Sequence, residues 1–370
     1  MQLPIDIPAV LKAATDIEAA AKTPLSVSVL IDDAAPLGCA GHVRAAFASA
    51  GPHTRVTIAY LGDGLAAVPA GDDFAVIVAG ASPVVGESAA RIRAAGVPVM
   101  VATTQPSLVH DVALEAGHPI PEGDICSPEG GAAPSALVRA VQERLDPAAE
   151  GREVDLAEDV AEAVGGEGAL TEEGAEALDL RMGRWICAAC DEKKLACALA
   201  FPFVRRPLAL DAVRATAIQN AAVGAAPIIP GADMPIMTLN QMKMLLQIAA
   251  AYGQPLNAER VKELAVVLGG AFLLRNVART AAGFVPVLGW AVRGAVGFGG
   301  TEAMGWAAIE YFEGGGDLAG AASVVQNGSA EAVKAVRQAA ATPAGQGALK
   351  AVKGAAGRAR ELLRSKAKSK

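Results

Sequence analysis

The chain has 370 residues and a formal charge of −7 at pH 7, and 52% of its residues are hydrophobic while only 4% are aromatic. This length predicts about two domains. The acidic balance argues against a nucleic-acid-binding protein, because phosphate binding needs a basic surface. The abundance of small apolar residues favours closely packed helices over an aromatic ligand groove.

The N-terminal residues show no basic stretch followed by an apolar core, so we expect no secretory signal peptide. The five cysteines are an odd number, which fits reduced thiols in the cytoplasm. Charged residues interrupt each apolar run that approaches the length of a membrane span. These residues are Glu263, Arg275, Arg279, Arg293 and Glu302. We therefore expect a cytoplasmic protein without an ordinary transmembrane helix, and leave contact with a membrane surface open.

Residues 22–148 alternate short apolar runs with segments of helical character. This alternation predicts a doubly wound α/β lobe around a mostly parallel sheet. The expected strands are 25–31, 55–61, 74–80 and 97–103, with a short fifth strand at 123–127. The expected helices are 40–50, 84–95 and 135–145.

Residues 149–183 are rich in Glu, Asp, Ala and Gly, and we interpret them as a solvated acidic linker. An all-α, glycine-rich lobe is expected over residues 184–328, because its glycines would let helix backbones approach closely. Within it, Thr238 and Gln241 fit the capping box of a helix that ends at Gly253.

Residues 329–370 are expected to form a helical, basic C-terminal tail. Its last part carries eight basic residues and the single acid Glu361. Near an anionic lipid surface each Lys or Arg adds about 1 kcal/mol of attraction, whereas a frayed solvated terminus is the alternative. The residues expected to contact the membrane are Lys350, Lys353, Arg358, Arg360, Arg364, Lys366, Lys368 and Lys370.

The turn after the first expected strand carries Asp32 and Asp33, where a phosphate-binding loop would have Gly-Lys-Ser/Thr. Two carboxylates there repel phosphate. A magnesium or phospho-acceptor site would need a further carboxylate at a later strand end, and Gly80, Thr103 and Thr104 stand there instead. We therefore expect no nucleotide or other cofactor, and place both aspartates at a helix N-terminus or on the surface.

Cys187 and Cys190 form a C-x-x-C pair, and Cys197 follows. A structural zinc site needs four ligands, and neither a histidine nor a fourth cysteine is near in the sequence. Spacings of three and seven also fit a buried helix face, so we interpret the three cysteines as core residues. No histidine belongs to a G-x-S-x-G nucleophile motif, and no catalytic or metal-binding residue is predicted. The four histidines are His42, His53, His110 and His118.

A longer pattern begins near residue 213. It comprises Ala217-Ile218-Gln219-Asn220-Ala221, Gly224, Pro227, Pro230, Asp233, Pro235, Gln241-Met242, Gln247-Ile248-Ala249 and Tyr252-Gly253. This pattern resembles the bacterial YcjF-like domain family of unknown function, a family often fused to Era-type GTPase domains, and covers residues 213–312. The resemblance implies no catalytic residue. Its structural motif is Pro227, Pro230, Asp233, Gln241 and Gly253. We expect a bend at 227–233, with Asp233 capping the helix or turn that follows.

The first lobe is similar to an Era-type GTPase domain in outline. Residues 124–127, followed by the helix expected at 135–145, resemble the last strand, Ser-Ala loop and final helix of that domain. Thr103-Thr104-Gln105-Pro106 stands where the guanine-reading Asn-Lys-x-Asp would be, and no Asp-x-x-Gly follows the third expected strand. The resemblance therefore implies a degenerate, GTPase-like lobe.

These observations predict a non-catalytic, membrane-associated scaffold or adaptor, peripheral to the inner face of the cytoplasmic membrane. Its partners would be an anionic membrane surface and a protein bound by the pseudo-GTPase-like lobe, and a homo-oligomer is compatible with the sequence. Two alternatives stay open. One is a membrane-inserted helical protein, and the other is a GTPase-like enzyme with an unrecognised nucleotide site.

Overall fold

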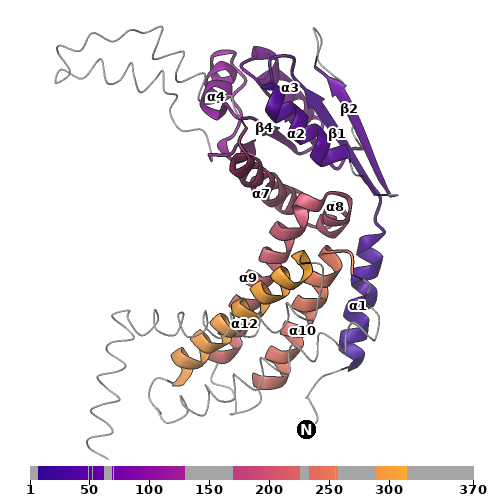
Figure 1. Ribbon diagram of the computed structural model, residues 1–370, viewed down its shortest axis with the longest axis vertical. Helices are drawn as coiled ribbons and strands as arrows, with labels where there is room; N and C mark the ends of the chain where they lie inside the picture. The colour runs from indigo at the N-terminus through magenta and orange to yellow at the C-terminus, as the bar shows by residue number, and fades with distance from the viewer. Residues whose placement is uncertain are drawn as a thin grey trace, which may run out of the picture. The chain divides into compact units, whose positions relative to one another are not determined.

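The computed structural model describes residues 7–48, 50–51, 53–61, 69, 71–129, 170–225, 233–254, 256 and 289–314. The chain forms two compact units. One comprises Ala19–Leu208, and we call it the sheet unit; the other comprises Met1–Glu18 with Ala209–Lys370, and we call it the helical unit. Figure 1 labels their helices and strands.

The sheet unit is built around a parallel sheet of five strands in the order β2-β1-β3-β4-β5, and every neighbouring pair is parallel. The strands are β1 (Leu25–Ile31), β2 (Thr54–Tyr60), β3 (Phe74–Val78), β4 (Val99–Ala102) and β5 (Ile125–Cys126). The helices are α2 (Leu37–Ala48), α3 (Pro83–Ala94), α4 (Pro106–Glu115), η1 (Glu122–Asp124), α7 (Glu172–Ala189), α8 (Lys194–Ala200) and η3 (Pro202–Val204). The α/β class with a parallel sheet is confirmed.

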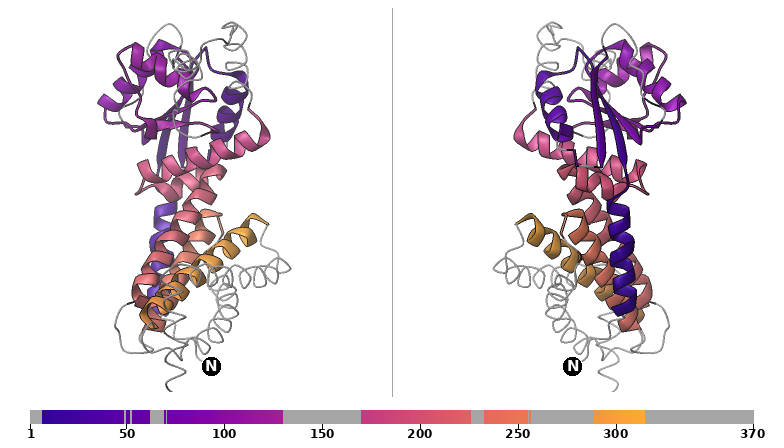
Figure 2. Two further views of the ribbon diagram at one scale, coloured as in Figure 1. Left: turned by 90° about the vertical axis from the view of Figure 1, so that its left-hand side faces the viewer. Right: turned by 90° about the vertical axis from the view of Figure 1, so that its right-hand side faces the viewer.

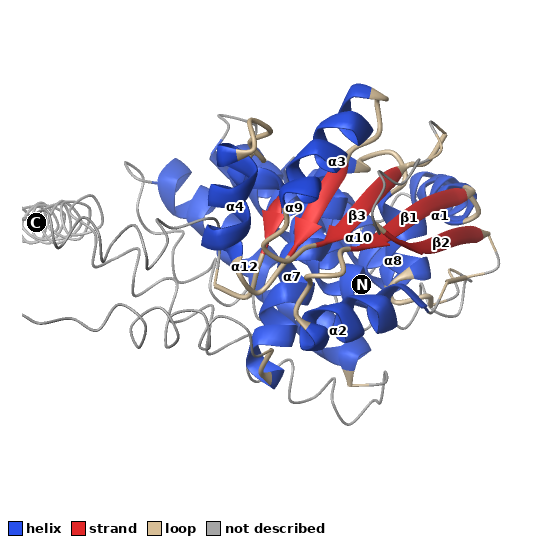
Figure 3. Ribbon diagram, turned by 90° about the horizontal axis from the view of Figure 1, so that it is seen from above, coloured by secondary structure: helices blue, strands red, loops and turns tan. Residues whose placement is uncertain are grey.

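The side chains of the strands explain their places in the sheet. β3 is an uninterrupted apolar run, and all its residues are buried, as expected for a parallel strand covered on both faces. β2 instead alternates half-buried and exposed residues, which fits its place at the edge of the sheet. Seen from above, α3 and α4 lie on one face of the sheet, while α2 and α7 lie on the other (Figure 3).

The two faces have different cores. Small aliphatic residues of β3 and β4 pack against α3 and α4 on one face. On the other face, aromatic rings gather from segments far apart in the sequence: Phe47 lies in α2, Phe74 in β3, and Phe201 precedes η3. The ring centroids of Phe47 and Phe201 are 4.8 Å apart in an edge-to-face arrangement, a favoured geometry for aromatic pairs.

Helix α7 occupies part of the stretch that the sequence suggested was an acidic linker. Thr171 begins it by accepting a hydrogen bond from the backbone N–H of Gly174 at 3.0 Å. The acids Glu172 and Glu173 of the first turn favour a helix N-terminus, and the buried face includes Leu178 and Met182. The expected boundary between residues 183 and 184 therefore falls inside α7, and the sheet unit extends to Leu208.

The helical unit is formed by α9 (Arg205–Ala225), α10 (Asp233–Ala251), α12 (Gly289–Glu313) and the N-terminal α1 (Ile7–Ala21), of which α1 and α9 run across the unit boundaries. A shared core joins α9, α10 and α12, and the three helices lie side by side in both views of Figure 2. The helical region after the sheet is thus confirmed. Within the described ranges, no helix combines the length and apolar content needed to cross a membrane.

Helix α10 differs from its expected form at its start. It begins at Asp233, so the capping box proposed at Thr238 and Gln241 is wrong. Thr238 and Gln241 lie in the middle of α10, and their side chains are buried. The side-chain amide of Gln241 donates a hydrogen bond to α12. At the other end, Gly253 has a φ of 71° and its N–H donates to the carbonyl of Ala250 at 2.9 Å, which is where the sequence predicts the end of this helix.

Candidate functional site

In a parallel sheet the first place to look for a ligand is the crevice at the carboxyl ends of the strands, where the strand order reverses. Here that point lies between β1 and β3, because β1 is followed in sequence by β2 on one side and β3 lies on the other. Asp32 follows β1 and Gly80 follows β3 by two residues. The Asp32–Gly80 pair is therefore the candidate switch-point site.

The chain itself fills this switch point. The carboxylate of Asp32 is buried and accepts a hydrogen bond from the N–H of Gly80 at 3.0 Å. The backbone N–H of Ala35 donates to the carbonyl of Asp32 at 2.9 Å. A Cβ atom placed on Gly80 would overlap the carbonyl oxygen of Ala34, so the two loops are in backbone contact. The surface or helix-terminal role expected for Asp32 is wrong, whereas Asp33 is exposed.

The loop after β4 is held in the same way. The hydroxyl of Thr103 donates to the carbonyl of Ala79 at 2.9 Å and accepts from the N–H of Gln105 at 3.0 Å. The neighbouring Thr104 hydroxyl is buried without a hydrogen-bond partner. Burial raises the pKa of Cys39 to about 12, which keeps this thiol protonated at neutral pH. The side chain of Thr103 therefore links the loop after β4 to the end of β3.

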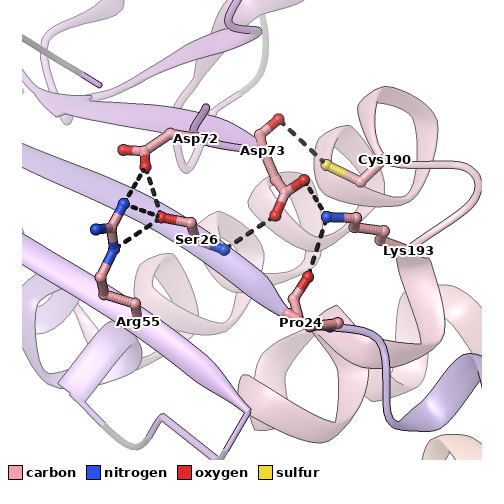
Figure 4. Close-up of polar contacts among 7 residues, drawn as sticks. All are labelled: Pro24, Ser26, Arg55, Asp72, Asp73, Cys190 and Lys193. Carbon is pink, nitrogen blue, oxygen red and sulfur yellow. Dashed lines mark hydrogen bonds and ion pairs between the residues drawn. The ribbon is translucent and has the colours of Figure 1, made fainter. Parts of the chain in front are cut away.

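A second polar cluster lies at the opposite edge of the sheet, where β1 and β3 begin (Figure 4). Asp72 accepts hydrogen bonds from the hydroxyls of Ser26 and Ser28, each at 2.5 Å. Arg55 of β2 reaches the same carboxylate at 3.2 Å. Asp72 is thus a buried carboxylate that is fully engaged by neighbouring strands, and the sequence did not single it out.

The adjacent Asp73 connects this edge to the segment between α7 and α8. Its carboxylate accepts from the N–H of Ser26 at 2.9 Å and from the ammonium of Lys193 at 2.6 Å. Lys193 also donates to the carbonyl of Pro24 at 3.0 Å. Cys190 is directed at the carbonyl of Asp73, at 4.0 Å (Figure 4). The strand edge and the turn after α7 are therefore joined by a network of charged and polar contacts.

The histidines do not assemble into a catalytic arrangement among the described residues. His42 of α2 lies 2.7 Å from the carboxylate of Asp179 in α7. His110 lies 3.3 Å from its neighbour Asp111, and His53 and His118 are exposed. In the same described ranges no group of three or more His, Cys, Asp or Glu side chains could hold a metal ion.

In the helical unit, buried polar side chains from three helices meet at Thr301 of α12. Its hydroxyl accepts from the amides of Asn220 in α9 and Gln241 in α10, each at 3.0 Å. Asn240 extends the layer by donating to the side-chain carbonyl of Asn220 at 3.0 Å. The sequence pattern contained Asn220 and Gln241 but did not indicate that they share a partner. We call this set of four residues the polar layer.

The other residues singled out from the sequence are not gathered at either edge of the sheet. Asp233 begins α10, and its capping role is not described because its side chain lies outside the described residues. Pro227, Pro230, the helix expected at 135–145, and all of 329–370 with its basic residues also lie outside them. The expected membrane contact therefore stays a prediction.

Comparison with known proteins identifies no relative. No protein-family model, no curated protein and no solved structure matches the chain.

Proposed function

We propose that this chain is a non-catalytic, membrane-associated scaffold or adaptor. In this proposal the sheet unit is a doubly wound, degenerate GTPase-like domain that binds a protein partner, and the helical unit is a glycine-rich YcjF-like domain. The protein would work at the inner face of the cytoplasmic membrane, with the basic residues between Lys350 and Lys370 on the anionic lipid surface.

The observation that carries the proposal is the bond between Asp32 and Gly80. A phosphate at the switch point would need free backbone N–H groups and positive charge. The N–H groups of Ala35 and Gly80 are engaged, the loops touch at Ala34, and the nearest side chain is a buried carboxylate. Folds of this kind usually bind a ligand at the switch point, but here the loops of the protein itself occupy it. This supports a role in binding proteins.

In the helical unit, small residues allow two helices to pack closely. A Cβ atom on Gly305 of α12 would overlap the side chain of Val213 in α9, so these two helices pack at a distance that only glycine allows. The polar layer adds hydrogen bonds across the same helices. Close packing of this kind supports a role of the helical unit as a docking module.

Two measurements on the full chain test the proposal. Titration calorimetry with GTP or ATP and magnesium should show no heat of binding at micromolar concentrations, and micromolar binding would replace the scaffold by a GTPase-like enzyme. Co-sedimentation with anionic vesicles at low salt should bring the protein into the pellet, and salt should weaken this binding because exposed charges are screened.

A matched variant separates the role of the tail. Replacing the eight basic residues between Lys350 and Lys370 by Gln keeps the length but removes the charge, and should abolish most of the salt-sensitive binding. Wild-type protein that stays in the supernatant with anionic vesicles would disprove the membrane part. Binding that resists both high salt and alkaline carbonate would instead identify a membrane-inserted protein.

A further inference from the structure

Three buried cysteines surround the turn between α7 and α8. Cys187 lies in the last turn of α7, Cys190 directly follows this helix, and Cys197 lies in α8. Their exposed fractions are 4%, 8% and 0%, so Cys190 is the most accessible of the three. None of the three forms a disulfide. The sequence places Cys187 and Cys190 in a C-x-x-C motif, which would make them the expected pair.

The structure pairs Cys190 with Cys197 instead. Their side chains are joined by a hydrogen bond. The backbone explains how residues seven apart meet: the N–H of Lys193 donates to the carbonyl of Cys190 at 2.9 Å, and the N–H of Cys197 donates to the carbonyl of Lys193 at 3.0 Å. These two consecutive turns of the chain therefore bring the thiol of Cys197 back to the thiol of Cys190.

The two thiols are chemically unequal. The hydrogen bond from Cys197 lowers the pKa of Cys190, against the opposing effect of burial. The same hydrogen bond, together with burial, raises the pKa of Cys197. Two charged groups face Cys190: Asp73, which disfavours its thiolate, and Lys193, which favours it. Cys190 is therefore suited to react first, because the thiolate is the nucleophile, and Cys197 to react second.

We propose that Cys190 and Cys197 are a redox-active pair that closes to a disulfide when the protein meets a peroxide. The thiolate sulfur of Cys190 attacks one peroxide oxygen, so that an S–O bond forms and the O–O bond breaks. The hydroxide that leaves takes up the proton that Cys190 released, which gives the first water. The sulfur of Cys197 then attacks the sulfenic sulfur of Cys190. The S–S bond forms, the S–O bond breaks, and the departing hydroxide takes the proton of Cys197. Two thiols are oxidised, and one peroxide is reduced to two waters.

The remaining cysteines make this pairing selective. Burial raises the pKa of both Cys39 and Cys126 to about 12, so neither is a ready nucleophile at neutral pH. Cys187 is buried in α7, and Cys197 rather than Cys187 is the residue whose side chain is hydrogen-bonded to Cys190. The proposed modification does not depend on whether the protein binds a membrane or a protein partner.

The test uses the reduced, full-length protein treated with hydrogen peroxide, after which free thiols are blocked by alkylation and the protein is digested with trypsin. Cleavage after Arg184, Lys193, Lys194 and Arg205 separates the proposed partners. Mass spectrometry should find the peptide 185–193 linked to the peptide 195–205, and dithiothreitol should release both. A loop within 185–193 would show that Cys187 is the partner and overturn the proposal.

Single serine variants sharpen the result. Cys187→Ser should still form the link, with a rate within about twofold of wild type, because serine keeps the size of the side chain. Cys197→Ser should stop at the sulfenic acid of Cys190, which dimedone traps. Cys190→Ser should form no link and leave Cys197 unmodified. Equal oxidation of all five cysteines, or no oxidation of a folded protein whose unfolded form oxidises readily, would also disprove the pair.

Lys193 gives a second readout that does not depend on the disulfide itself. Replacing Lys193 by Gln removes the positive charge that favours the Cys190 thiolate, so the alkylation of Cys190 at neutral pH should slow by several-fold. Lys193→Arg keeps the charge and should restore the rate. If Lys193→Gln reacts like the wild type, the charge of Lys193 has no part in activating the Cys190 thiol, and that part of the proposal is wrong.

Discussion

The backbone N–H of Gly80 donates a hydrogen bond to the buried carboxylate of Asp32, 3.0 Å away, at the point where the strand order of the sheet reverses. The same position in a ligand-binding α/β fold offers its N–H groups to the ligand. Here the side chain of Asp32, which directly follows β1, takes that place and binds the loop after β3. The contact explains why an acidic residue can be buried there, and it gives the first prediction.

Asp32→Ala should lower the free energy of unfolding by about 1–3 kcal/mol, because it leaves the N–H of Gly80 buried without an acceptor. Asp32→Asn keeps an acceptor oxygen and should cost less. Asp33→Ala alters an exposed neighbour and should change stability by no more than about 0.5 kcal/mol. Urea unfolding measures all three, and similar losses for Asp32→Ala and Asp33→Ala would contradict the role given to the Asp32 carboxylate.

Gly80→Ala should be strongly destabilising, by more than about 2 kcal/mol, because the added methyl group meets the backbone of Ala34, which cannot yield as a side chain can. Gly41, in α2, is the matched control, since a Cβ atom there meets nothing within 4 Å. Gly41→Ala should raise stability by about 0.5–1 kcal/mol through its better helix propensity. Thermal unfolding of the two variants should move in opposite directions.

The polar layer of the helical unit gives a third prediction. Thr301→Val keeps the shape of the side chain but removes the hydroxyl that accepts from Asn220 and Gln241. Two buried amides lose an acceptor, so the loss of stability should be about 1–3 kcal/mol, while Thr301→Ser should retain most of it. Urea unfolding followed by circular dichroism is the measurement. Equal stability of the valine and serine variants would show that the hydrogen bonds contribute nothing net.

The buried thiol of Cys39 leads us to expect that the protein loses stability at alkaline pH. Burial raises its pKa to about 12 in the folded protein, from an ordinary value of 9.0. Between these values the unfolded chain binds fewer protons than the folded protein, so the free energy of unfolding falls as pH rises. The slope for one thiol is at most about 1.4 kcal/mol per pH unit.

Cys39→Ala removes this titrating group, so its stability should fall less steeply than that of the wild type from about pH 9 upward. The cavity left by the smaller side chain lowers stability at every pH and cancels when slopes are compared. Urea midpoints at several pH values decide the matter, and parallel curves for the two proteins would contradict the prediction.

How much of the fold could be predicted depends on whether the signal is local. The strand expected at 25–31 matches β1, because an apolar run between turn residues is sufficient evidence for a buried strand. The strand expected at 74–80 ends earlier, at Val78. The last two residues of that run, Ala79 and Gly80, are apolar because their loop packs against other loops.

Two helices of the sheet unit were missed for local reasons. The segment Pro106–Glu115 begins with proline, and Gly117 with a positive φ follows it, so both ends look like turns. Helix α7 carries two acids in its first turn, which the composition of the region made look like a charged linker. For Pro106–Glu115 the available signal was the proline at its first position, and for α7 it was the capping residue Thr171.

The contacts at the sheet edges could not be predicted, because their partners are distant in the sequence. Ser26 and Asp72 are 46 residues apart, and Cys190 and Asp73 are 117 apart. Only the strand order and the path of the chain after α7 bring them together. A pattern of residue types fixes neither, so the sequence indicated neither the contact of Ser26 with Asp72 nor that of Cys190 with Asp73.

The two serines of β1 restrict the register in which this strand can pair with its neighbours. Ser26 and Ser28 point to the same face, as residues two apart on a strand do, and both donate to Asp72. A slip of β1 by two residues would put Leu30 in place of one hydroxyl, and a slip by one would turn both serines to the opposite face. Either error would leave a buried carboxylate short of donors. The two serines therefore specify the register of β1. This strand, whose other residues are apolar, can pair with β3 in only one alignment without losing these hydrogen bonds.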